Sequence, residues 1–459
     1  MATPKRKIKK REKSATPVYF LSLTVENARC FGPKQPLDLS DGNGRPAQWT
    51  IILGENGVGK TTLLQSLVAI LPVYDPYYDD QGKLHTKEKV VPRISEDDKT
   101  LWKLSRQSNN RFRLSANFST KARLDEKKEG SLVDDFYYDA AGNIEEYKIE
   151  YTVLEPLICF GYGASRRMSE TAVSGEGNGD STASLFSNEV ALFNAEEWLL
   201  RADYSAHFPS SIQERARQQR DRVKEILIEI LPDVTDIQFL PPTEEKMLPQ
   251  IRVQTHYGWV SIKDLSLGYK TLIAWMVDFA RRMFELYPDE PKPLEQPAVV
   301  LVDEIDLHLH PKMQRDLMSR LSKIFPNTQF IATAHSPLVA QAAENANIVL
   351  LRREGDHVVI DNDPQVIKGW RVDQILTSEL FGLKSARSLE YDEAIQEREK
   401  ILAKARLTKK DKVRLRELAA IISDFPTGET PIEIEAMDIV RRAAERLKRE
   451  NNLTNDSHN

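Results

Sequence analysis

Short apolar segments along the chain predict the buried strands of an α/β fold. The runs Trp49–Leu53 and Ala298–Val302 are almost wholly apolar, which is typical of strands in a parallel sheet covered on both faces. Thr328–Thr333 is predicted to be another strand of the parallel sheet, whereas Tyr19–Val25 alternates apolar and polar residues as a half-solvated strand does. A further strand is predicted within Tyr151–Phe160. Several strands separated by longer segments indicate a sheet flanked by helices.

Apolar residues with a period of about 3.6 predict helices between these strands. They fit a helix after residue 61, a helix over residues 212–230, and a helix after residue 270. The chain after residue 385, rich in Glu, Lys, Arg, Ala and Leu, predicts a helical tail. The apolar runs fall far short of the roughly 18 residues that a membrane span needs, so we expect no membrane partner.

Composition adds that the chain can form a true core but carries no disulfide scaffold. Hydrophobic residues make up 41% and charged residues 29% of 459 residues, and there are two cysteines. The net charge is 64 − 69 = −5, so affinity for nucleic acid would need a local basic patch. The basic run over residues 5–13 fits either a solvated tail or a phosphate contact. Because the start of the chain has no apolar signal segment, we expect a cytoplasmic protein.

One segment, Gly54–Thr61, matches the phosphate-binding pattern G-x-x-x-x-G-K-[ST] in full. It follows an apolar strand and opens an apolar helix, which is the context the motif requires. Glycines let successive backbone N–H groups face phosphate oxygens, and the helix N-terminus adds its positive dipole. Lys60 is expected to reach the terminal phosphates and the Thr61 hydroxyl to bind Mg²⁺, so ATP and Mg²⁺ are the predicted cofactors. The predicted nucleotide-binding residues here are Gly54, Glu55, Asn56, Gly57, Val58, Gly59, Lys60, Thr61 and Thr62.

Two acidic residues close the buried strand at Ala298–Val302. The carboxyl edge of a parallel sheet is where ligands bind in α/β folds. Asp303 is therefore the expected Mg²⁺ partner, and Glu304 is placed to polarise the attacking water. The alternative for this pair is a solvated acidic turn.

Two weaker signals complete the candidate site. Ser266 precedes an apolar helix, where it is either an ordinary N-cap or part of an anion-binding helix start. His335 follows the strand Thr328–Thr333 and is a candidate sensor of the γ-phosphate. His308 and His310 lie two positions apart and do not share a helical face, so a metal site there is not expected.

In this order, these segments resemble the ABC-type ATPase head of SMC, RecF and OLD-nuclease proteins. The resemblance implies a Walker A loop at Gly54–Thr61, a Walker B strand ending at Glu304, and a D-loop at residues 305–311. Residues 265–269 resemble the signature motif LSGGQ but differ at its third and last positions, and Arg29 lies in a segment that packs near the nucleotide in such heads. A clear Q-loop glutamine is missing, and residues 160–167 take that place. Arg166 and Arg167 there are candidates for phosphate or partner contact, or are surface arginines.

The roles that the resemblance implies can be assigned residue by residue. The catalytic residues would be Glu304, His335 and Lys60, and the metal-binding residues Thr61 and Asp303. Arg29 would bind nucleotide together with the loop residues named above. The signature residues that act in trans would be Ser266 and Gly268. Two ATP molecules are then held between two copies of the chain in a homodimer.

The same resemblance predicts the domain organisation. A head with two lobes is expected, with a compact insertion or lid that includes a strand rejoining the head, a helical partner-docking region, and disordered tails. The head comprises residues 1–72 and 251–384, and the insertion comprises residues 73–250 with its strand near 151–160. The partner-docking region is 385–450, and the tails are 1–15 and 451–459.

The segment Asp373–Leu383 and the charged tail resemble the PtuA ATPases of Septu and retron anti-phage systems, with the AriA ATPase of the PARIS system as a near alternative. This implies an ATPase that controls a separate nuclease effector, of the HNH (PtuB-like) or the Toprim type. No nuclease constellation of its own is recognisable, and Asp361-Asn362-Asp363 is only a short acidic turn. A DNA-repair ATPase of RecF or SMC type that binds nucleic acid, and a scaffold with structural ATP, are the alternatives.

Overall fold

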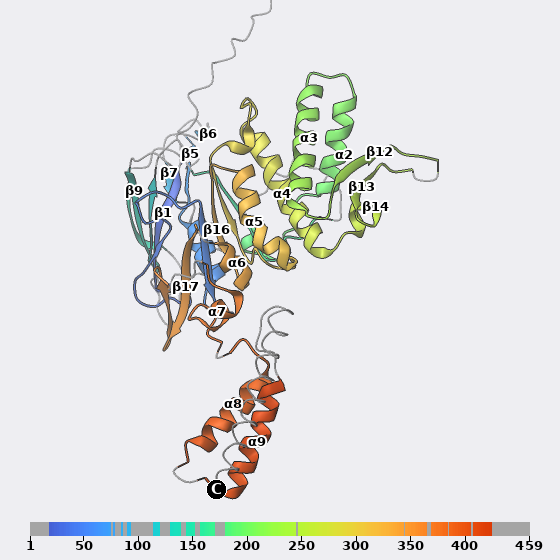
Figure 1. Ribbon diagram of the computed structural model, residues 1–459. Coiled ribbons are helices and arrows are strands. Elements are labelled where there is room, and N and C mark those ends of the chain that lie inside the picture. The colour runs from blue at the N-terminus through green and yellow to red at the C-terminus, as the bar shows by residue number, and fades with distance from the viewer. Residues whose placement is uncertain are drawn as a thin grey trace, which may run out of the picture. The chain divides into compact units, whose positions relative to one another are not determined.

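The computed structural model (Figure 1) divides into two compact units, residues 1–382 and residues 383–459. The structure describes residues 18–74, 77–78, 84–85, 90–92, 113–119, 129–138, 144–151, 157–169, 180–244, 247–343, 345–364, 369–383, 385–404 and 407–424. Within these ranges, no helix is both long enough and apolar enough to cross a membrane. The predicted tails, 1–15 and 451–459, lie outside the described residues.

A six-stranded sheet forms the centre of the first unit. Its order is β11-β15-β16-β3-β17-β18, and β18 alone runs antiparallel to its neighbour. The bounds are β3 Trp49–Gly54, β11 Cys159–Tyr162, β15 Ala298–Val302, β16 Thr328–Thr333, β17 Asn347–Glu354 and β18 His357–Asp361. All residues of β15 and β16 are buried, as the unbroken apolar sequence of β15 predicts. The parallel strands β15, β16 and β3 end at one edge, where the loops that follow them meet.

The two faces of this sheet belong to two different cores. In β15, Val299 and Leu301 join one core, while Val300 and Val302 join the other, because side chains alternate along a strand. The first core lies between the central sheet, helix α1 (Lys60–Ala69) and an antiparallel second sheet of order β10-β9-β8-β1-β2. That sheet's strands are β1 Tyr19–Glu26, β2 Gln35–Asp38, β8 Arg113–Ser119, β9 Glu129–Tyr138 and β10 Ile144–Tyr151.

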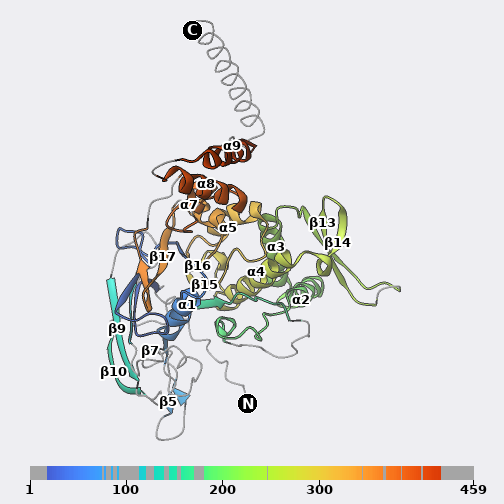
Figure 2. The same ribbon diagram turned by 90° about the horizontal axis from the view of Figure 1, so that it is seen from below.

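Helices cover the other face of the central sheet and share the second core. Figure 2 shows β9 and β10 along one side of this unit and α2 to α5 on the other. The helices are α2 Ala195–His207, α3 Gln213–Ile230, α4 Leu267–Leu286, α5 Pro311–Ile324, α6 Pro337–Ala342 and α7 Val372–Thr377, with short 3-10 helices η2 Ala183–Leu185, η3 Ile262–Asp264 and η4 Pro293–Glu295. The predicted fold class, α/β with a mixed sheet flanked by helices, is confirmed.

Smaller sheets complete the first unit. One has the order β12-β13-β14, with bounds Asp236–Leu240, Gln250–Thr255 and Gly258–Ser261, and its strands β13 and β14 form a hairpin. Two more pair β4 (Pro72–Tyr74) with β7 (Val90–Pro92), and β5 (Tyr77–Tyr78) with β6 (Leu84–His85). Residues 73–150 gave no strand signal in the sequence, yet β8 from this segment pairs with β1.

The second unit contains helices α8 (Leu389–Leu402) and α9 (Lys409–Asp424) among its described residues. A small apolar cluster of Ala394, Ile401 and Leu418 joins them. Arg414 pairs with Glu397 across the two helices at 2.8 Å. The domain ranges predicted from the sequence, including a partner-docking role for this region, stay a prediction.

Candidate functional site

The phosphate-binding motif lies on the loop between β3 and α1, and its glycines adopt conformations that side chains disfavour. The φ angles of Gly54, Gly57 and Gly59 are 146°, 79° and 88°. Gly59 is the N-cap of α1 and provides no side-chain cap, which leaves the first N–H groups of the helix available to an anion. A Cβ at Gly59 would lie 2.3 Å from Sγ of Cys30, so space as well as φ requires glycine.

Lys60 is held over this loop. Its side chain is buried, and Nζ donates hydrogen bonds to the carbonyl oxygens of Gly54 at 2.9 Å and Glu55 at 2.8 Å. Burial lowers the pKa of Lys60, while the charges of Asp303, Glu304 and Asp306 act in the opposite direction. The ammonium group is therefore fixed within the loop and close to the acidic end of β15.

The Walker A and Walker B segments meet through hydroxyl groups. Thr61 Oγ1 donates a hydrogen bond of 2.7 Å to Oδ2 of Asp303. Thr333, at the end of β16, donates one of 2.7 Å to Oδ1 of the same carboxylate. Its hydroxyl also accepts a hydrogen bond of 2.7 Å from the amide nitrogen of Glu304. Nothing in the sequence distinguishes Thr333, because a threonine at the end of a strand is typical of any β-branched strand residue.

Glu304 begins the turn after β15 in a left-handed conformation, with φ of 50°. Such a φ is uncommon for a residue that carries a side chain, and it clusters at functional sites. The next residue, Ile305, donates its amide to the carbonyl oxygen of Thr333 at 2.9 Å, which keeps the turn against β16. The carboxylate of Glu304 is thus carried on a tightly held turn beside the phosphate loop.

Arg166 differs from both expectations drawn from the sequence. It lies neither on the surface nor open to a partner, because it is only 2% exposed. Its guanidinium donates hydrogen bonds to the carbonyl oxygens of Asp303 at 2.6 Å and Glu304 at 2.8 Å. Burial lowers the pKa of Arg166 to about 10, and the nearby carboxylates of Asp303, Asp306 and Glu304 oppose the change. Arg167, the next residue, is exposed.

Arg29 packs against the start of α1. It has a φ of 48°, and its Nη1 donates hydrogen bonds to Oε1 of Gln65 at 2.8 Å and Oγ1 of Thr62 at 3.4 Å. Burial lowers the pKa of Arg29. These contacts hold Arg29 against the helix that the phosphate loop opens, to which Thr62 belongs. Contact of either residue with nucleotide stays a prediction.

His335 follows β16 and is tied to the D-loop. Its backbone amide donates to the carboxylate of Asp306, at 3.1 Å to Oδ2 and 3.3 Å to Oδ1. His310 serves as the N-cap of α5, where its Nδ1 accepts from the amide of Lys312 at 3.3 Å. Over the described ranges, no three His, Cys, Asp or Glu residues form a metal-binding group.

The signature segment lies at the N-terminus of α4. Ser266 is exposed, and its hydroxyl accepts a hydrogen bond of 3.4 Å from the amide of Tyr269, so it is an N-cap within its own chain. Gly268 is buried against the D-loop, since a Cβ there would lie 2.2 Å from the carbonyl oxygen of His308. His308 itself has a φ of 62°. The role of Ser266 and Gly268 toward a second copy stays a prediction.

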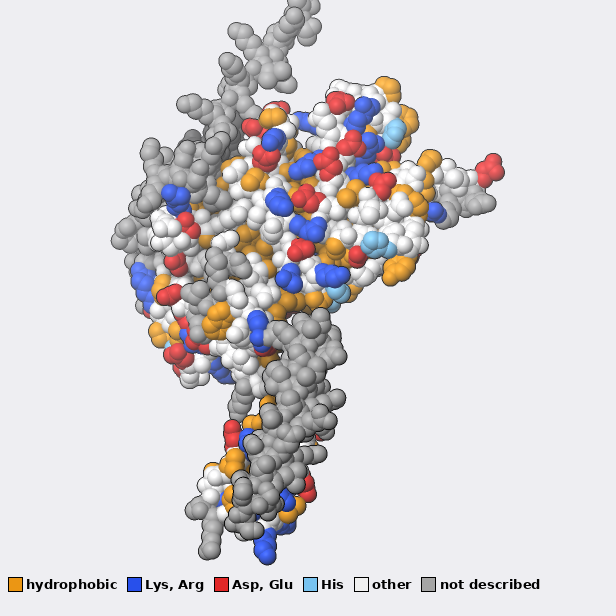
Figure 3. Space-filling model, viewed as in Figure 1, with side chains coloured by type: hydrophobic (Ala, Val, Ile, Leu, Met, Phe, Trp, Pro, Cys, Tyr) orange, Lys and Arg blue, Asp and Glu red, His pale blue; other side chains and the backbone are white. Residues whose placement is uncertain are grey.

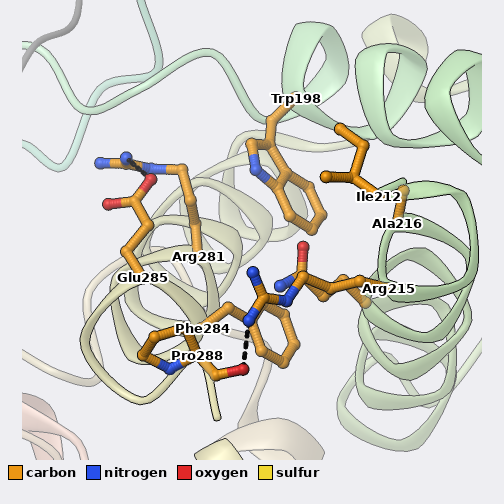
Figure 4. Close-up of a pocket in the computed structure, with 9 residues that line it drawn as sticks. Trp198, Ile212, Arg215, Ala216, Arg281, Phe284, Glu285 and Pro288 are labelled. Carbon is orange, nitrogen blue, oxygen red and sulfur yellow. Dashed lines mark hydrogen bonds and ion pairs between the residues drawn. The ribbon is translucent and has the colours of Figure 1, made fainter. Parts of the chain in front are cut away.

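A separate cavity of about 340 Å³ lies between α2, α3 and α4 (Figure 4). The rings of Trp198 and Phe284 lie nearly parallel there, with centroids 6.4 Å apart, and Arg215 reaches the carbonyl oxygen of Pro288. None of the predicted site residues lines this cavity. On the face shown in Figure 3, basic and acidic side chains are interspersed over the helices of the first unit.

Residues 50–340 match the protein family described as "AAA domain, putative AbiEii toxin, Type IV TA system". The chain belongs to this family of AAA domains. The matched range runs from the phosphate loop to the segment after β16 and does not include Arg29.

Curated relatives support the resemblance stated for the sequence. The chain is 33% identical to the "Retron Ec83 probable ATPase" of Escherichia coli over 185 residues, which are 40% of this chain and 33% of that protein. It is 26% identical to the "Septu protein PtuA" of Bacillus mycoides (strain KBAB4) over 356 residues, 76% of this chain and 42% of that protein. The chain thus spans less than half the length of these relatives. The resemblance to Septu and retron ATPases is confirmed.

Solved structures with a similar fold include an SMC head bound to the C-winged helix domain of ScpA and a RecF–ATP complex. The first has 14% identity and a TM-score of 0.41, covering 75% of this chain and 97% of that one. The second has 13% identity and a TM-score of 0.38, covering 77% and 100%. At such scores, neither superposition adds to what the strand order already shows.

The residues at the edge of the sheet fit a magnesium–nucleotide complex. The uncapped helix start at Gly59 and the buried Lys60 suit phosphate oxygens, and the Thr61 hydroxyl with the Asp303 carboxylate is an oxygen donor set that Mg²⁺ prefers. Asp303 is only 5% exposed, so a cation there would be held in a partly dry environment.

Proposed function

We propose that this chain binds ATP with Mg²⁺ and hydrolyses it to ADP and phosphate, as the ATPase subunit of an anti-phage defence complex. The observation that carries the proposal is the 2.7 Å hydrogen bond between Thr61 and Asp303. It joins the Walker A and Walker B segments, which lie 242 positions apart in the chain, into one site. The names of the Septu and retron relatives support the defence role.

The roles of the residues follow from their chemistry. The backbone N–H groups at Gly57 to Thr61 and the ammonium of Lys60 bind the phosphates. Thr61 and Asp303 hold Mg²⁺, which offsets the negative charge on the phosphate oxygens. Glu304 orients the attacking water and accepts its proton, and His335 contacts the γ-phosphate.

The proposal includes an ATP-dependent homodimer, because Ser266 and Gly268 are assigned to the nucleotide of a second copy. Ser266 is exposed at the start of α4, where a second copy can reach its hydroxyl, whereas Gly268 is buried. The first-turn N–H groups of a 20-residue helix also suit a phosphate. Joining the two copies through ATP would make assembly depend on nucleotide state.

The partner in this proposal is a separate nuclease effector, of HNH or Toprim type, which the ATPase controls. The second unit supports this, since its exposed Leu389 and Val413 leave apolar surface on α8 and α9. Direct binding of nucleic acid belongs to the alternative, a DNA-repair ATPase. ATP turnover that DNA stimulates in the absence of any partner would favour that alternative.

The test uses the purified full chain, with ATP turnover and mass in solution measured together. Lys60→Ala should abolish nucleotide binding, with the exposed Lys312→Ala as its matched control. Glu304→Gln should bind ATP, turn over slowly and accumulate as a dimer, with Glu354→Gln as its control. If Glu304→Gln hydrolyses ATP at the wild-type rate, the role of Glu304 is wrong. If the wild-type chain neither binds nor hydrolyses ATP, the proposed function is wrong.

A further inference from the structure

Arg166 is a buried cation beneath the acidic turn that ends β15. It follows β11, the strand that pairs with β15 at the edge of the central sheet. The amide of Asp303 donates to the carbonyl oxygen of Tyr162 at 2.8 Å, which extends this pairing to the last residue before Glu304. The segment from Tyr162 to Arg166 therefore runs directly alongside the end of Walker B.

The guanidinium binds two successive carbonyl groups. Nη1 donates to Asp303 at 2.6 Å and Nη2 to Glu304 at 2.8 Å. At the end of a strand, carbonyl groups leave the hydrogen-bonding ladder and need other partners when they are buried. The planar fork of an arginine can satisfy two neighbouring oxygens at once, whereas the ammonium of a lysine has no such fixed fork.

The backbone of both partners is strained. Glu304 has a φ of 50° and Arg166 a φ of 33°, and neither is glycine. Left-handed conformations of such residues persist only where their surroundings fix them. The peptide groups on either side of Glu304 Cα are held, with its amide bonded to the Thr333 hydroxyl and its carbonyl bonded to Arg166. These two bonds fix the direction in which the Glu304 side chain leaves the backbone.

Stability alone is a weak reason for this arrangement. The Nε of Arg166 is buried without a hydrogen-bond partner among the described residues. Burying a guanidinium is costly, and replacing such a group with apolar side chains is often neutral or stabilising. The carboxylates of Asp303, Asp306 and Glu304 attract the cation, which ties it to the acidic cluster of the site.

We propose that Arg166 is the positioning residue of the Walker B turn, holding Glu304 in the left-handed conformation that aims its carboxylate at the attacking water. The inference rests on the proposed ATPase function and adds a residue to it. Arg166 occupies the segment where a Q-loop glutamine was expected, but it acts through the backbone of Asp303 and Glu304.

The test compares Arg166→Gly, Arg166→Lys and the matched control Arg167→Gly in the full chain. Glycine accepts the positive φ at position 166 and leaves a space shaped like a guanidinium ion. Turnover number, the dissociation constant of a fluorescent ATP analogue, and melting temperature are measured, with and without guanidinium chloride far below denaturing concentrations.

For Arg166→Gly we expect kcat to fall about 10- to 100-fold, as a misplaced catalytic group does, with little change in analogue affinity. Added guanidinium should restore part of kcat in Arg166→Gly only, and Arg166→Lys should keep an intermediate kcat. Arg167→Gly should behave as wild type.

Three outcomes would overturn the inference. The first is an unchanged kcat in Arg166→Gly. The second is a parallel loss of kcat, affinity and melting temperature that guanidinium does not rescue. The third is failure of both Arg166 variants to fold, which would make Arg166 a structural residue. If the proposed ATPase function is itself wrong, the wild-type chain lacks ATP turnover. This result distinguishes that case from the three outcomes above.

Discussion

Thr333 and Asp303, thirty positions apart in the chain, are joined by a hydrogen bond of 2.7 Å from hydroxyl to carboxylate. Thr333 also accepts the amide hydrogen of Glu304, so one side chain contacts both acidic residues of Walker B. The position of β16 beside β15 makes this possible, because the two strands are parallel and end together.

Thr333→Val should lower kcat about 10- to 100-fold, because a hydrogen bond to a charged group contributes about 1.5–3 kcal/mol. Valine keeps the shape of threonine and loses the hydroxyl, so the strand itself should persist. Thr333→Ser, which keeps the hydroxyl, should retain most of the activity. The measurement is steady-state ATP hydrolysis by the two variants. Equal activity of the valine and serine variants would contradict the role given to the Thr333 hydroxyl.

Gly268→Ala should loosen the contact between the signature helix and the D-loop. The added methyl group would lie 2.2 Å from the carbonyl oxygen of His308, and overpacking of this kind costs about 1–3 kcal/mol. We expect a lower free energy of unfolding in urea and weaker ATP-dependent dimerisation. Leu267→Ala is the control for stability only, since Leu267 is 58% exposed on the same turn of α4. Wild-type stability of Gly268→Ala would show that the D-loop moves aside at no cost.

Alanine at the two glycines of the phosphate loop should have unequal effects. At Gly59 the Cβ meets Sγ of Cys30 at 2.3 Å and the ring of Phe31 at 3.0 Å, whereas at Gly57 it meets no atom within 4 Å. Both variants suffer the strain of a positive φ, so Gly59→Ala should lose more stability and more nucleotide affinity than Gly57→Ala.

A double-mutant cycle isolates the contact with the thiol. Cys30→Gly removes Sγ and should recover part of the stability of Gly59→Ala, which calorimetry can measure. Strict additivity of the two substitutions would mean that the loop relaxes away from Cys30.

A chain that ends after Gly382 should keep ATP hydrolysis and its melting temperature. The two large cores of the first unit draw their buried members from Val18 to Leu380, and the cluster on α8 and α9 is separate. If this region docks the effector, the shortened chain should no longer co-purify with it. A fall in melting temperature of many degrees would show instead that the second unit supports the first.

The sequence predicted the parts of the site that depend on local chemistry. The sequence predicted the strands at Trp49–Leu53, Ala298–Val302 and Thr328–Thr333. For Ala298–Val302 the reason is an unbroken apolar run, which is typical of a strand in a sheet covered on both faces. The strand predicted within residues 151–160 instead contains the end of β10 and the start of β11, with residues 152–156 outside the described ranges. The strands between residues 73 and 150 carried no signal, because their mixed polar sequence lacks a clear period.

By itself, the sequence determined the phosphate loop, the acidic strand end and the α/β class, since each is written in consecutive residues whose spacing has a direct chemical meaning. The fold, in contrast, is what buries Arg166 beneath Asp303 and Glu304. It also places Thr333 between these two residues and Gly268 against His308. These relationships join residues 30 to 138 positions apart or rest on the close approach of two backbones. They depend on strand order and on the conformation of a single turn. Neither can be predicted from the local pattern of the amino-acid sequence.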